Sequence, residues 1–545
     1  MVVVPGVGAY RGYFQDDDLD TLSWAAYVPE SHFWRNLFDP IVQNVNFRPA
    51  GGYYYHAIAR VAGLKFGWYV AVLQALHALN TLMVWRLLAR LGVKPWPALA
   101  GAAFFAFHPA CFDAYWRPMF VFDVLCATFS MACLLAWMER RWAISLLSFW
   151  LAYRSKELAI ALPLVLAAYE FRLGERKWKP LIPFLAVSFS FGIQAILLNR
   201  GQRTPYSLDF SGKAIWTTAR YYAGELGFPF AGMILAGVAA LLRDRRAWLG
   251  AAGFWVLLGP MLALPGRQIS VYLYVPLALA AVVVAVTAEK TRWVWPALAG
   301  WLVFSAWALP PYAAKEIAMG EDHRRFVGTL REFVHSHPEI QRYFYESIPA
   351  SLRPWGISGA LMYVCREVRR TENPCELDRA DDSRFQPVAH DQSAAVLAWD
   401  AAQRRMVIIS GKGGDAPAAR IRMDTLTPVW QLRRGWYGRE GTFRWMQPEA
   451  EVRLQKPEGA TRFRMELVVP VAVLGEAKQR DIEVFLDERS LGRVTVLKTG
   501  QQKVDWKAPA GRGGPVSVRI VSKPGMQDPY EPREIAVAVE ALGFE

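Results

Sequence analysis

The chain has 545 residues, of which 53% are hydrophobic, 14% are aromatic and only 20% are charged. That charged fraction is low for a soluble protein, and long apolar runs up to about residue 312 argue against a wholly soluble chain. The net charge of +14 invites a nucleic-acid partner, but many Lys and Arg residues punctuate the apolar runs, which is the pattern of membrane topology. We expect a multi-span α-helical membrane protein that contacts the lipid bilayer and binds no nucleic acid.

An acidic stretch near the N-terminus places Asp16, Asp17, Asp18 and Asp20 within five residues, ahead of the apolar runs. Charges are costly in hydrocarbon, so this stretch is expected in water or at the edge of a membrane cavity. Neighbouring like charges and partial burial raise the pKa of a carboxyl group, which suits a general base. A solvated acidic loop is an equal alternative for the same residues.

Residues 1–67 are expected to form an extracytoplasmic acidic loop with interfacial helices, because the part after residue 23 is rich in Trp and Tyr. Residues 68–312 are expected to form a transmembrane helical domain of about ten spans. The first span ends in basic residues, which places that end in the cytoplasm. The expected spans lie near 68–91, 96–112, 118–138, 142–153, 158–171, 180–198, 228–242, 247–264, 270–287 and 293–312.

Basic loops are expected on the cytoplasmic side of the membrane. A second group of charges does not fit this rule and is expected on the outward side, near span ends. These are Arg117, Arg154, Lys156, Glu157 and Arg267, together with the acidic stretch. Such a grouping predicts a cavity for an anionic, lipid-linked substrate whose phosphate pairs with Arg and Lys. The alternatives are that Arg117 and Arg267 anchor to membrane lipid phosphate, and that Lys156 and Glu157 neutralise each other.

Residues 313–395 read as a mixed linker domain on the outward side, with helix-like stretches at 322–335 and 358–370. Cys365 and Cys375 lie ten residues apart on the oxidising side and are a disulfide candidate, with two free thiols as the alternative. His and Cys residues do not cluster at ligand spacing, so we expect no cofactor and no metal site built from them; a divalent metal requirement is left open.

Residues 396–545 change to an alternation of period two, with turn segments at short spacing, which favours an antiparallel, jelly-roll-like β-sandwich. The segment from Gly435 to Trp445 carries several aromatic residues. They either stack on sugar rings or pack in the core and domain contacts. The strands are expected to include 406–409, 442–445, 462–467, 482–486, 516–520 and 535–539.

The order of several motifs between about residues 10 and 312 resembles the GT-C glycosyltransferases, and among them the protein O-mannosyltransferase-like branch. The motifs are the acidic stretch, Asn46-Phe47-Arg48-Pro49, a first span with Gln74, His77 and Asn80, His108-Pro109, Ser155-Lys156-Glu157, and Arg267 followed by Tyr272-Leu273-Tyr274-Val275-Pro276. The resemblance implies a polyprenyl-phosphate-sugar donor and transfer on the extracytoplasmic face. Family members carry a span before the acidic motif, and we expect this chain to lack it.

Carried onto this sequence, the resemblance implies that a carboxylate of Asp16, Asp17 or Asp18 is the catalytic base. It places Arg267 near the lipid phosphate. We further expect the donor phosphate to contact Lys156, Arg154 and Arg117, and Arg48, Glu157 and Tyr272 to line the cavity or the acceptor site.

The resulting prediction is a glycosyltransferase of a bacterial inner (plasma) membrane and cell envelope. Its acceptor is an extracytoplasmic hydroxyl of a protein, lipid or glycan, which attacks the donor by direct displacement. The alternative is a non-catalytic membrane protein that assembles or transports polyprenyl-linked glycan. A transporter is expected to carry charged or broken helices at mid-membrane. The unexplained charges of this sequence lie at span ends instead, which disfavours a transporter.

Overall fold

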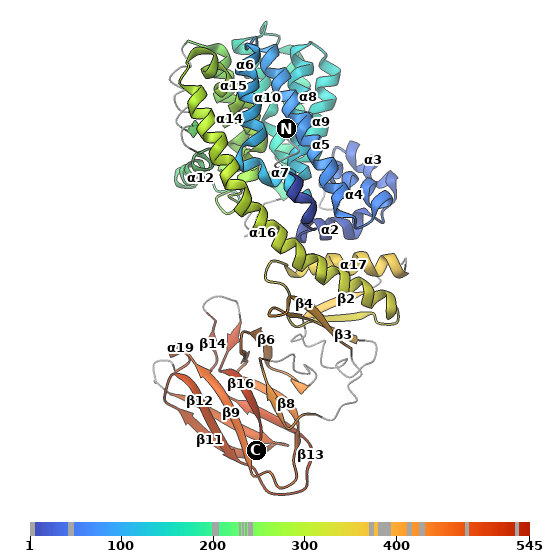
Figure 1. Cartoon of the computed structure of the whole chain (residues 1–545), viewed down its shortest axis with the longest axis vertical. Coiled ribbons are helices and arrows are strands. Elements are labelled where there is room, and N and C mark those ends of the chain that lie inside the picture. The colour runs from blue at the N-terminus through green and yellow to red at the C-terminus, as the bar shows by residue number, and fades with distance from the viewer. Residues whose placement is uncertain are drawn as a thin grey trace. The chain divides into compact units, whose positions relative to one another are not determined.

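The computed structural model divides the chain into two compact units, Met1–Glu321 and Asp322–Glu545 (Figure 1). The first unit is helical, and the second combines a small mixed α/β part with a larger all-β part. The structure describes residues 6–41, 48–198, 207–227, 230–231, 234, 237, 243–369, 375–379, 394–410, 417–424, 431–474, 479–528 and 533–545.

The N-terminal segment forms helices rather than the loop expected for the acidic stretch. The three aspartates Asp16, Asp17 and Asp18 make the first turn of α2, where negative charge interacts favourably with the helix dipole. Gln15 and Asp18 close a capping box there, which satisfies two backbone N–H groups that the helix leaves open. Helices α2 and α3 both pack against α4, and the bounds are η1 Val7–Arg11, α2 Asp16–Ala25, α3 Glu30–Phe38 and α4 Pro49–Ala62.

The rest of the first unit is a bundle in which α5 packs against α6 and α8, and α15 packs against α6 and α14. Helix α15 consists largely of Ala, Val and Leu and is buried along most of its length. The elements are α5 Phe66–Arg90, α6 Pro95–Phe107, η3 Pro109–Cys111, α7 Phe112–Trp116, η4 Pro118–Phe120, α8 Val121–Met138, α9 Trp142–Ser155, η5 Glu157–Ala161, α10 Leu162–Arg172, η6 Lys179–Leu181, α11 Ile182–Leu198, α12 Gly212–Glu225, α14 Arg245–Leu262, η7 Ser270–Leu273, α15 Tyr274–Lys290 and α16 Val294–Ser336.

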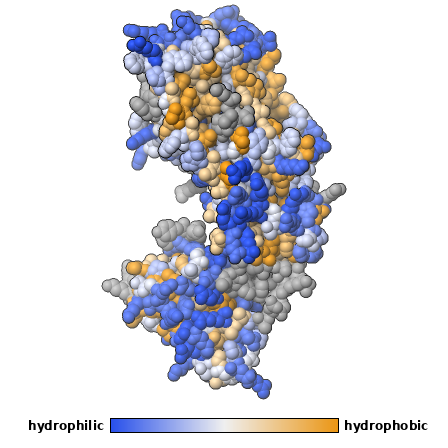
Figure 2. All heavy atoms as spheres, in the orientation of Figure 1, coloured by the Kyte–Doolittle hydropathy of each residue, from blue (hydrophilic) through white to orange (hydrophobic). Residues whose placement is uncertain are grey.

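Among the described residues, four helices are long and apolar enough to cross a membrane: Phe66–Arg90, Pro118–Met138, Ser270–Lys290 and Val294–Ser336. The expected multi-span helical architecture is therefore confirmed. Hydrophobic side chains also remain exposed on the helical part, seen as orange patches in Figure 2. The last helix does not end near residue 312 as expected. Polar residues such as Lys315 and Glu316 end the apolar run there, but they are good helix formers, so α16 continues.

Basic residues meet at one end of the helical unit. Arg90 at the end of α5 pairs with Glu139 at 2.7 Å, and Arg246 at the start of α14 pairs with Glu289 at 2.8 Å. Arg246 also donates to the Gly92 carbonyl. Helix α8 ends beside this basic group and begins at the opposite end, where the candidate site residues lie.

The second unit begins with a four-stranded mixed sheet in the order β2-β1-β3-β4, where β1 pairs in parallel with β2 and β3. The expected sandwich boundary at residue 396 is wrong, because β3 and β4 belong to this sheet. Strand β3 is buried on both faces, as a strand in a parallel pairing is, and does not alternate. The bounds are β1 Arg342–Tyr345, α17 Pro354–Arg369, β2 Glu376–Arg379, β3 Ala394–Asp400 and β4 Arg405–Ser410.

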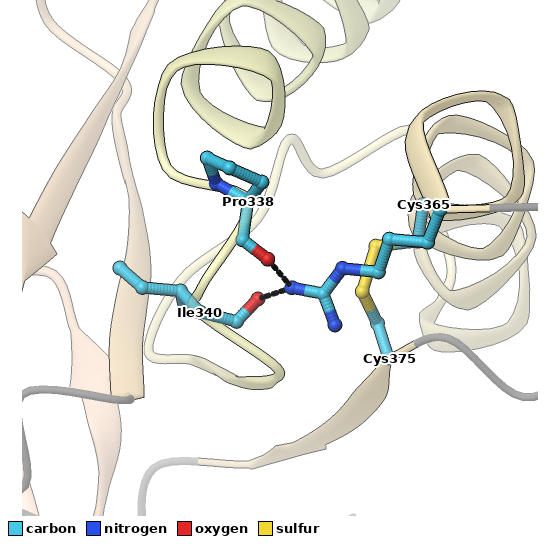
Figure 3. Close-up of a disulfide and its surroundings, with 5 residues drawn as sticks. Pro338, Ile340, Cys365 and Cys375 are labelled. Atoms are coloured by element: carbon cyan, nitrogen blue, oxygen red, sulfur yellow. Dashed lines mark hydrogen bonds between the residues drawn. A yellow bond between two sulfur atoms is a disulfide. The ribbon is translucent and has the colours of Figure 1, made fainter.

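A disulfide joins Cys365 in α17 to Cys375 just before β2, with 6.2 Å between the Cα atoms (Figure 3). Close by, the guanidinium of Arg369 donates to the carbonyls of Pro338 and Ile340. The disulfide thus ties α17 to the start of β2, and Arg369 ties it to the segment before β1.

Most of the remaining strands form a β-sandwich of two antiparallel sheets, as expected, and β14 pairs with β15 in a small separate sheet. One sheet has the order β11-β10-β13-β8, and the other has β12-β9-β16-β7-β6 with β5 added beside β16. Trp436 and Trp445 lie in the shared core, so the core alternative is correct for these aromatic residues. The bounds are β5 Arg420–Arg422, β6 Trp436–Glu440, β7 Phe443–Met446, β8 Glu449–Lys456, β9 Arg462–Val469, α19 Val471–Leu474, β10 Arg480–Leu486, β11 Arg489–Val496, β12 Gly500–Lys507, β13 Gly514–Val521, β14 Met526–Gln527, β15 Glu534–Ile535 and β16 Ala538–Phe544.

Candidate active site

The three aspartates at the start of α2 differ sharply in exposure. Asp18 is completely buried, Asp16 is half-buried and Asp17 is exposed. Asp20, one turn further along, is also exposed. A helix turn presents successive residues about 100° apart, so a single acidic run delivers one carboxylate to the core and others to solvent.

Both carboxylate oxygens of Asp18 are occupied. Oδ1 accepts the hydroxyl of Tyr55 in α4 at 2.5 Å, and Oδ2 accepts the backbone N–H of Gln15 at 2.8 Å. Burial raises the pKa of Asp18 to about 7, although both donors and the positive charge of Arg117 favour the ionised form. Asp18 therefore anchors α2 to α4, and substrate has no access to its oxygens.

Arg117 lies in a first group of polar side chains, which we call the Arg117 cluster: Gln15, Asp113, Arg117, Tyr312 and Glu316. Arg117 donates to the Gln15 side chain and lies 3.4 Å from Asp113 and 3.7 Å from Glu316. Gln15 donates to Glu316 at 2.7 Å, and Tyr312 donates to Asp113 at 2.6 Å. This cluster joins the residue before α2 to the end of α7 and to α16.

A second group, the Lys156 cluster, consists of Arg48, Asp123, Lys156, Glu157 and Tyr272. Lys156 donates to Asp123 at 2.6 Å, with both side chains buried, and its ammonium lies 4.4 Å from the centre of the Tyr272 ring. Arg48 binds Glu157 with two parallel hydrogen bonds of 2.8 Å. Burial alone would raise the pKa of Glu157, but Arg48 lowers it below its ordinary value, so this pair is ionised.

Phe122 at the start of α8 lies near both the Asp18–Tyr55 pair and the Lys156 cluster. Its ring lies 6.4 Å from that of Tyr55, the partner of Asp18, and the Arg48 guanidinium lies 5.9 Å from its centre. Arg117 and Asp123 flank the same short stretch of chain. The acidic turn, three cations and their carboxylate partners therefore gather at one end of the helical unit.

Arg154, one of the predicted phosphate ligands, contacts the end of α3. The guanidinium of Arg154 is buried and donates to the carbonyl of Asn36, while Trp150 donates to that of Leu37 at 2.7 Å. These carbonyls end α3 and need donors from outside the helix, so Arg154 has a structural role there. Arg267 lies in the turn between α14 and η7, and the contacts that define the two clusters do not include it.

The sequence reasoning missed several members of this site. Asp123 carried a usable signal, because a carboxylate within an apolar span is a functional candidate by default. Asp113, Tyr312 and Glu316 carried no such signal in the sequence, since their roles depend on contacts within the Arg117 cluster. The Asn46-Phe47 part of the Arg48 motif lies outside the described residues.

An apolar groove of about 520 Å³ opens beside the Lys156 cluster. Pro49 and Ala50, which directly follow Arg48, form part of its wall, and Leu151 comes from the last turns of α9. The remaining lining residues are Phe33, Trp34, Leu37, Tyr53, Tyr54, Ala57, Ile58, Val72, Leu76, Leu125 and Phe129. An apolar groove next to a bidentate arginine suits an amphiphile with an anionic head. Within the described part of the chain, three or more His, Cys, Asp or Glu side chains do not gather as a metal site.

No family model matches the sequence, and no curated protein matches it. Among solved structures, the arabinofuranosyltransferase AftD from mycobacteria has 12% identity, a TM-score of 0.41, and coverage of 99% of this chain and 58% of that one. The arabinosyltransferase EmbB from Mycobacterium smegmatis has 13% identity, a TM-score of 0.34, and coverage of 99% and 64%. The chain thus spans less than two thirds of either length. Both TM-scores lie below 0.5, so neither likeness bears on fold or activity, and the O-mannosyltransferase-like branch stays a prediction.

Proposed function

We propose that the protein is a membrane glycosyltransferase of GT-C type that moves a sugar from a polyprenyl-phosphate donor to an acceptor hydroxyl. The observation that carries this proposal is the gathering of an exposed carboxylate, Asp17, with the paired cations Arg48, Arg117 and Lys156 at one end of the helical unit. Transfer from a lipid phosphate needs both kinds of group: a base for the acceptor and positive charge for the leaving phosphate.

Asp17 is the proposed base, because it is the most exposed of the three carboxylates in the first turn of α2. Its carboxylate takes the proton of the acceptor hydroxyl while the oxygen attacks the anomeric carbon of the sugar. The bond between that carbon and the phosphate oxygen breaks, and the lipid phosphate leaves. Asp18 is a positioning residue in this scheme, since its bond to Tyr55 fixes the start of α2.

Lys156 and Arg48 are the proposed ligands of the donor phosphate, with Arg117 as a further cation. Asp123 and Glu157 neutralise Lys156 and Arg48 with carboxylate oxygens at 2.6 and 2.8 Å. A phosphate offers the same bidentate oxygen geometry and more charge. The apolar groove next to Arg48 is proposed to hold the first part of the lipid chain.

The proposed orientation is that the site and residues after 312 face the outside of a bacterial inner membrane. Support comes from the basic group around Arg90 and Arg246 at the opposite end of the helical unit, because cytoplasmic ends collect Lys and Arg. Protease added to right-side-out vesicles is expected to remove the β-sandwich. Cleavage only in inverted vesicles would reverse the orientation.

The function is tested with the full-length protein in nanodiscs and radiolabelled mannosyl and arabinosyl polyprenyl phosphates. We expect transfer of the label to a hydroxyl acceptor with release of polyprenyl phosphate, and loss of donor binding in Lys156→Met. Stoichiometric donor binding without bond cleavage would instead support the non-catalytic assembly or transport alternative. A protein that neither binds nor cleaves either donor would contradict both.

A further inference from the structure

A polar hollow of about 550 Å³ lies on one face of the β-sandwich, within the size range of small-molecule sites. It is contained in the second unit and has no part in the proposed transfer reaction. The hollow is lined by Arg422, Asp424, Thr442, Glu466, Gln501, Gln502, Lys503, Glu540 and Ala541.

Strand register explains why the sheet is hollowed here. One row across four strands reads Lys503 on β12, Glu466 on β9, Ala541 on β16 and Arg422 on β5. The short side chain of Ala541 thus lies between the long charged side chains of Glu466 and Arg422 and forms the floor of the hollow. Ala541 is almost completely buried at this floor.

A β-bulge aims an additional carboxylate at the same place. On β16 the pairing with β9 passes from Val539 to Ala541, so Glu540 is the extra residue with no partner on β9. Bulges re-aim side chains and are frequent beside functional sites, whereas a regular solvated strand has no need of one. Thr442 donates to Glu540 at 2.8 Å and Gln501 donates to it at 3.1 Å, which fixes the direction of its carboxylate.

The charges of the hollow nearly cancel, with two basic and three acidic lining residues. Each cation already has a carboxylate partner, since Arg422 binds Asp424 at 3.0 Å and Lys503 binds Glu466 at 3.2 Å. A phosphate or an acidic polymer would find no surplus positive charge. The wall instead alternates planar donors and acceptors: guanidinium, carboxylate and amide groups.

We propose that this hollow binds a neutral carbohydrate chain. A sugar hydroxyl both donates and accepts a hydrogen bond, so vicinal hydroxyls match a wall in which acceptors such as Glu540 alternate with donors such as Gln501 and Arg422. None of the lining residues is aromatic, so recognition depends on these hydrogen bonds and single-site binding is weak.

The test applies the full-length protein, clustered through an epitope tag so that weak sites bind multivalently, to a printed array of neutral and acidic oligosaccharides. We expect binding to one or more neutral glycans. Glu540→Ala is expected to lower that signal by about tenfold or more, because an acceptor of several hydrogen bonds is lost. Lys503→Ala is a second variant, and its exposed side chain makes unfolding no concern.

Glu483→Ala is the matched control, because Glu483 is a carboxylate on the other sheet that also accepts a hydroxyl hydrogen bond, from Ser490 at 2.9 Å. Its signal should equal that of the unmodified protein. Binding by unmodified protein to acidic glycans alone, no binding to any neutral glycan, or undiminished binding by both hollow variants would each overturn the proposal. Loss in Glu483→Ala would overturn it too, because binding would then not depend on the hollow.

Discussion

Ion pairs in the helical unit and in the β-sandwich both join a basic to an acidic side chain, but in different surroundings. The side chains of Lys156 and Asp123 are 7% and 2% exposed, whereas those of Arg493 and Glu483 are 62% and 27% exposed. Exposed pairs contribute roughly 0–1 kcal/mol, since water screens them, but removing one partner of a buried pair leaves an uncompensated charge. Buried charges in the helical unit are therefore expensive to leave unpaired, whereas exposed charges on the sandwich can lose a partner at little cost.

The largest loss of stability is expected for Asp123→Ala, which leaves the Lys156 ammonium buried and unpaired. We expect a loss of about 3–5 kcal/mol in the stability of the helical unit. Thermal unfolding can be followed by a thiol dye, because the free cysteines Cys111, Cys126 and Cys133 are all buried in that unit.

Glu367→Ala is the control for an exposed pair, followed by urea unfolding of the second unit, since Glu367 holds Arg331 by two hydrogen bonds on a half-exposed surface. It should cost less than about 1 kcal/mol. The double variant Asp123→Leu with Lys156→Met should recover much of the loss, because both charges are removed together. Equal losses in Asp123→Ala and Glu367→Ala would contradict the comparison.

The disulfide provides the next largest expected effect. Cys365→Ser is expected to cost about 2–3 kcal/mol on the chain-entropy model, since the bridge closes a short loop. The measurement is urea unfolding of the second unit, together with mass spectrometry of unreduced peptides. If Cys365 and Cys375 of the unmodified protein, purified from its native compartment, are both alkylated as free thiols, the bridge does not form.

Buried charge in the helical unit is also tested by the pH dependence of stability that Asp18 causes. Its pKa is raised from 3.8 to about 7, so the folded protein holds this proton more tightly than the unfolded chain. The contribution of Asp18 to stability is therefore greatest below about pH 4. It falls as pH rises toward 7, by at most about 1.4 kcal/mol per pH unit. Asp18→Asn mimics the protonated form and should flatten the slope measured by thermal unfolding between pH 5 and 7. An unchanged slope would mean that Asp18 titrates normally.

The features predicted correctly from sequence depend on local composition. Hydropathy indicated the helices, alternation indicated the sandwich, and the placement of Lys and Arg indicated which helix ends would meet. Long-range partners were not predictable in this way. Asp18 is buried only because Tyr55 of α4 lies opposite, and Lys156 is neutralised by Asp123 of another helix. The sequence boundary placed most of β3 in the sandwich, because its parallel partner β1 lies about 50 residues earlier in the chain, although its apolar run does not alternate.

The central claim is that Asp17, and not merely negative charge on α2, acts as the base. Asp17→Asn and Asp20→Asn form a matched pair, because both residues are exposed on the same helix and both changes remove one charge. The measurement is sugar transfer from a polyprenyl-phosphate donor by full-length protein in membranes, with donor binding measured in parallel. We predict a loss of about 10²–10⁴ in kcat for Asp17→Asn, unchanged donor affinity, and near-normal turnover for Asp20→Asn. Full activity in Asp17→Asn would contradict the claim.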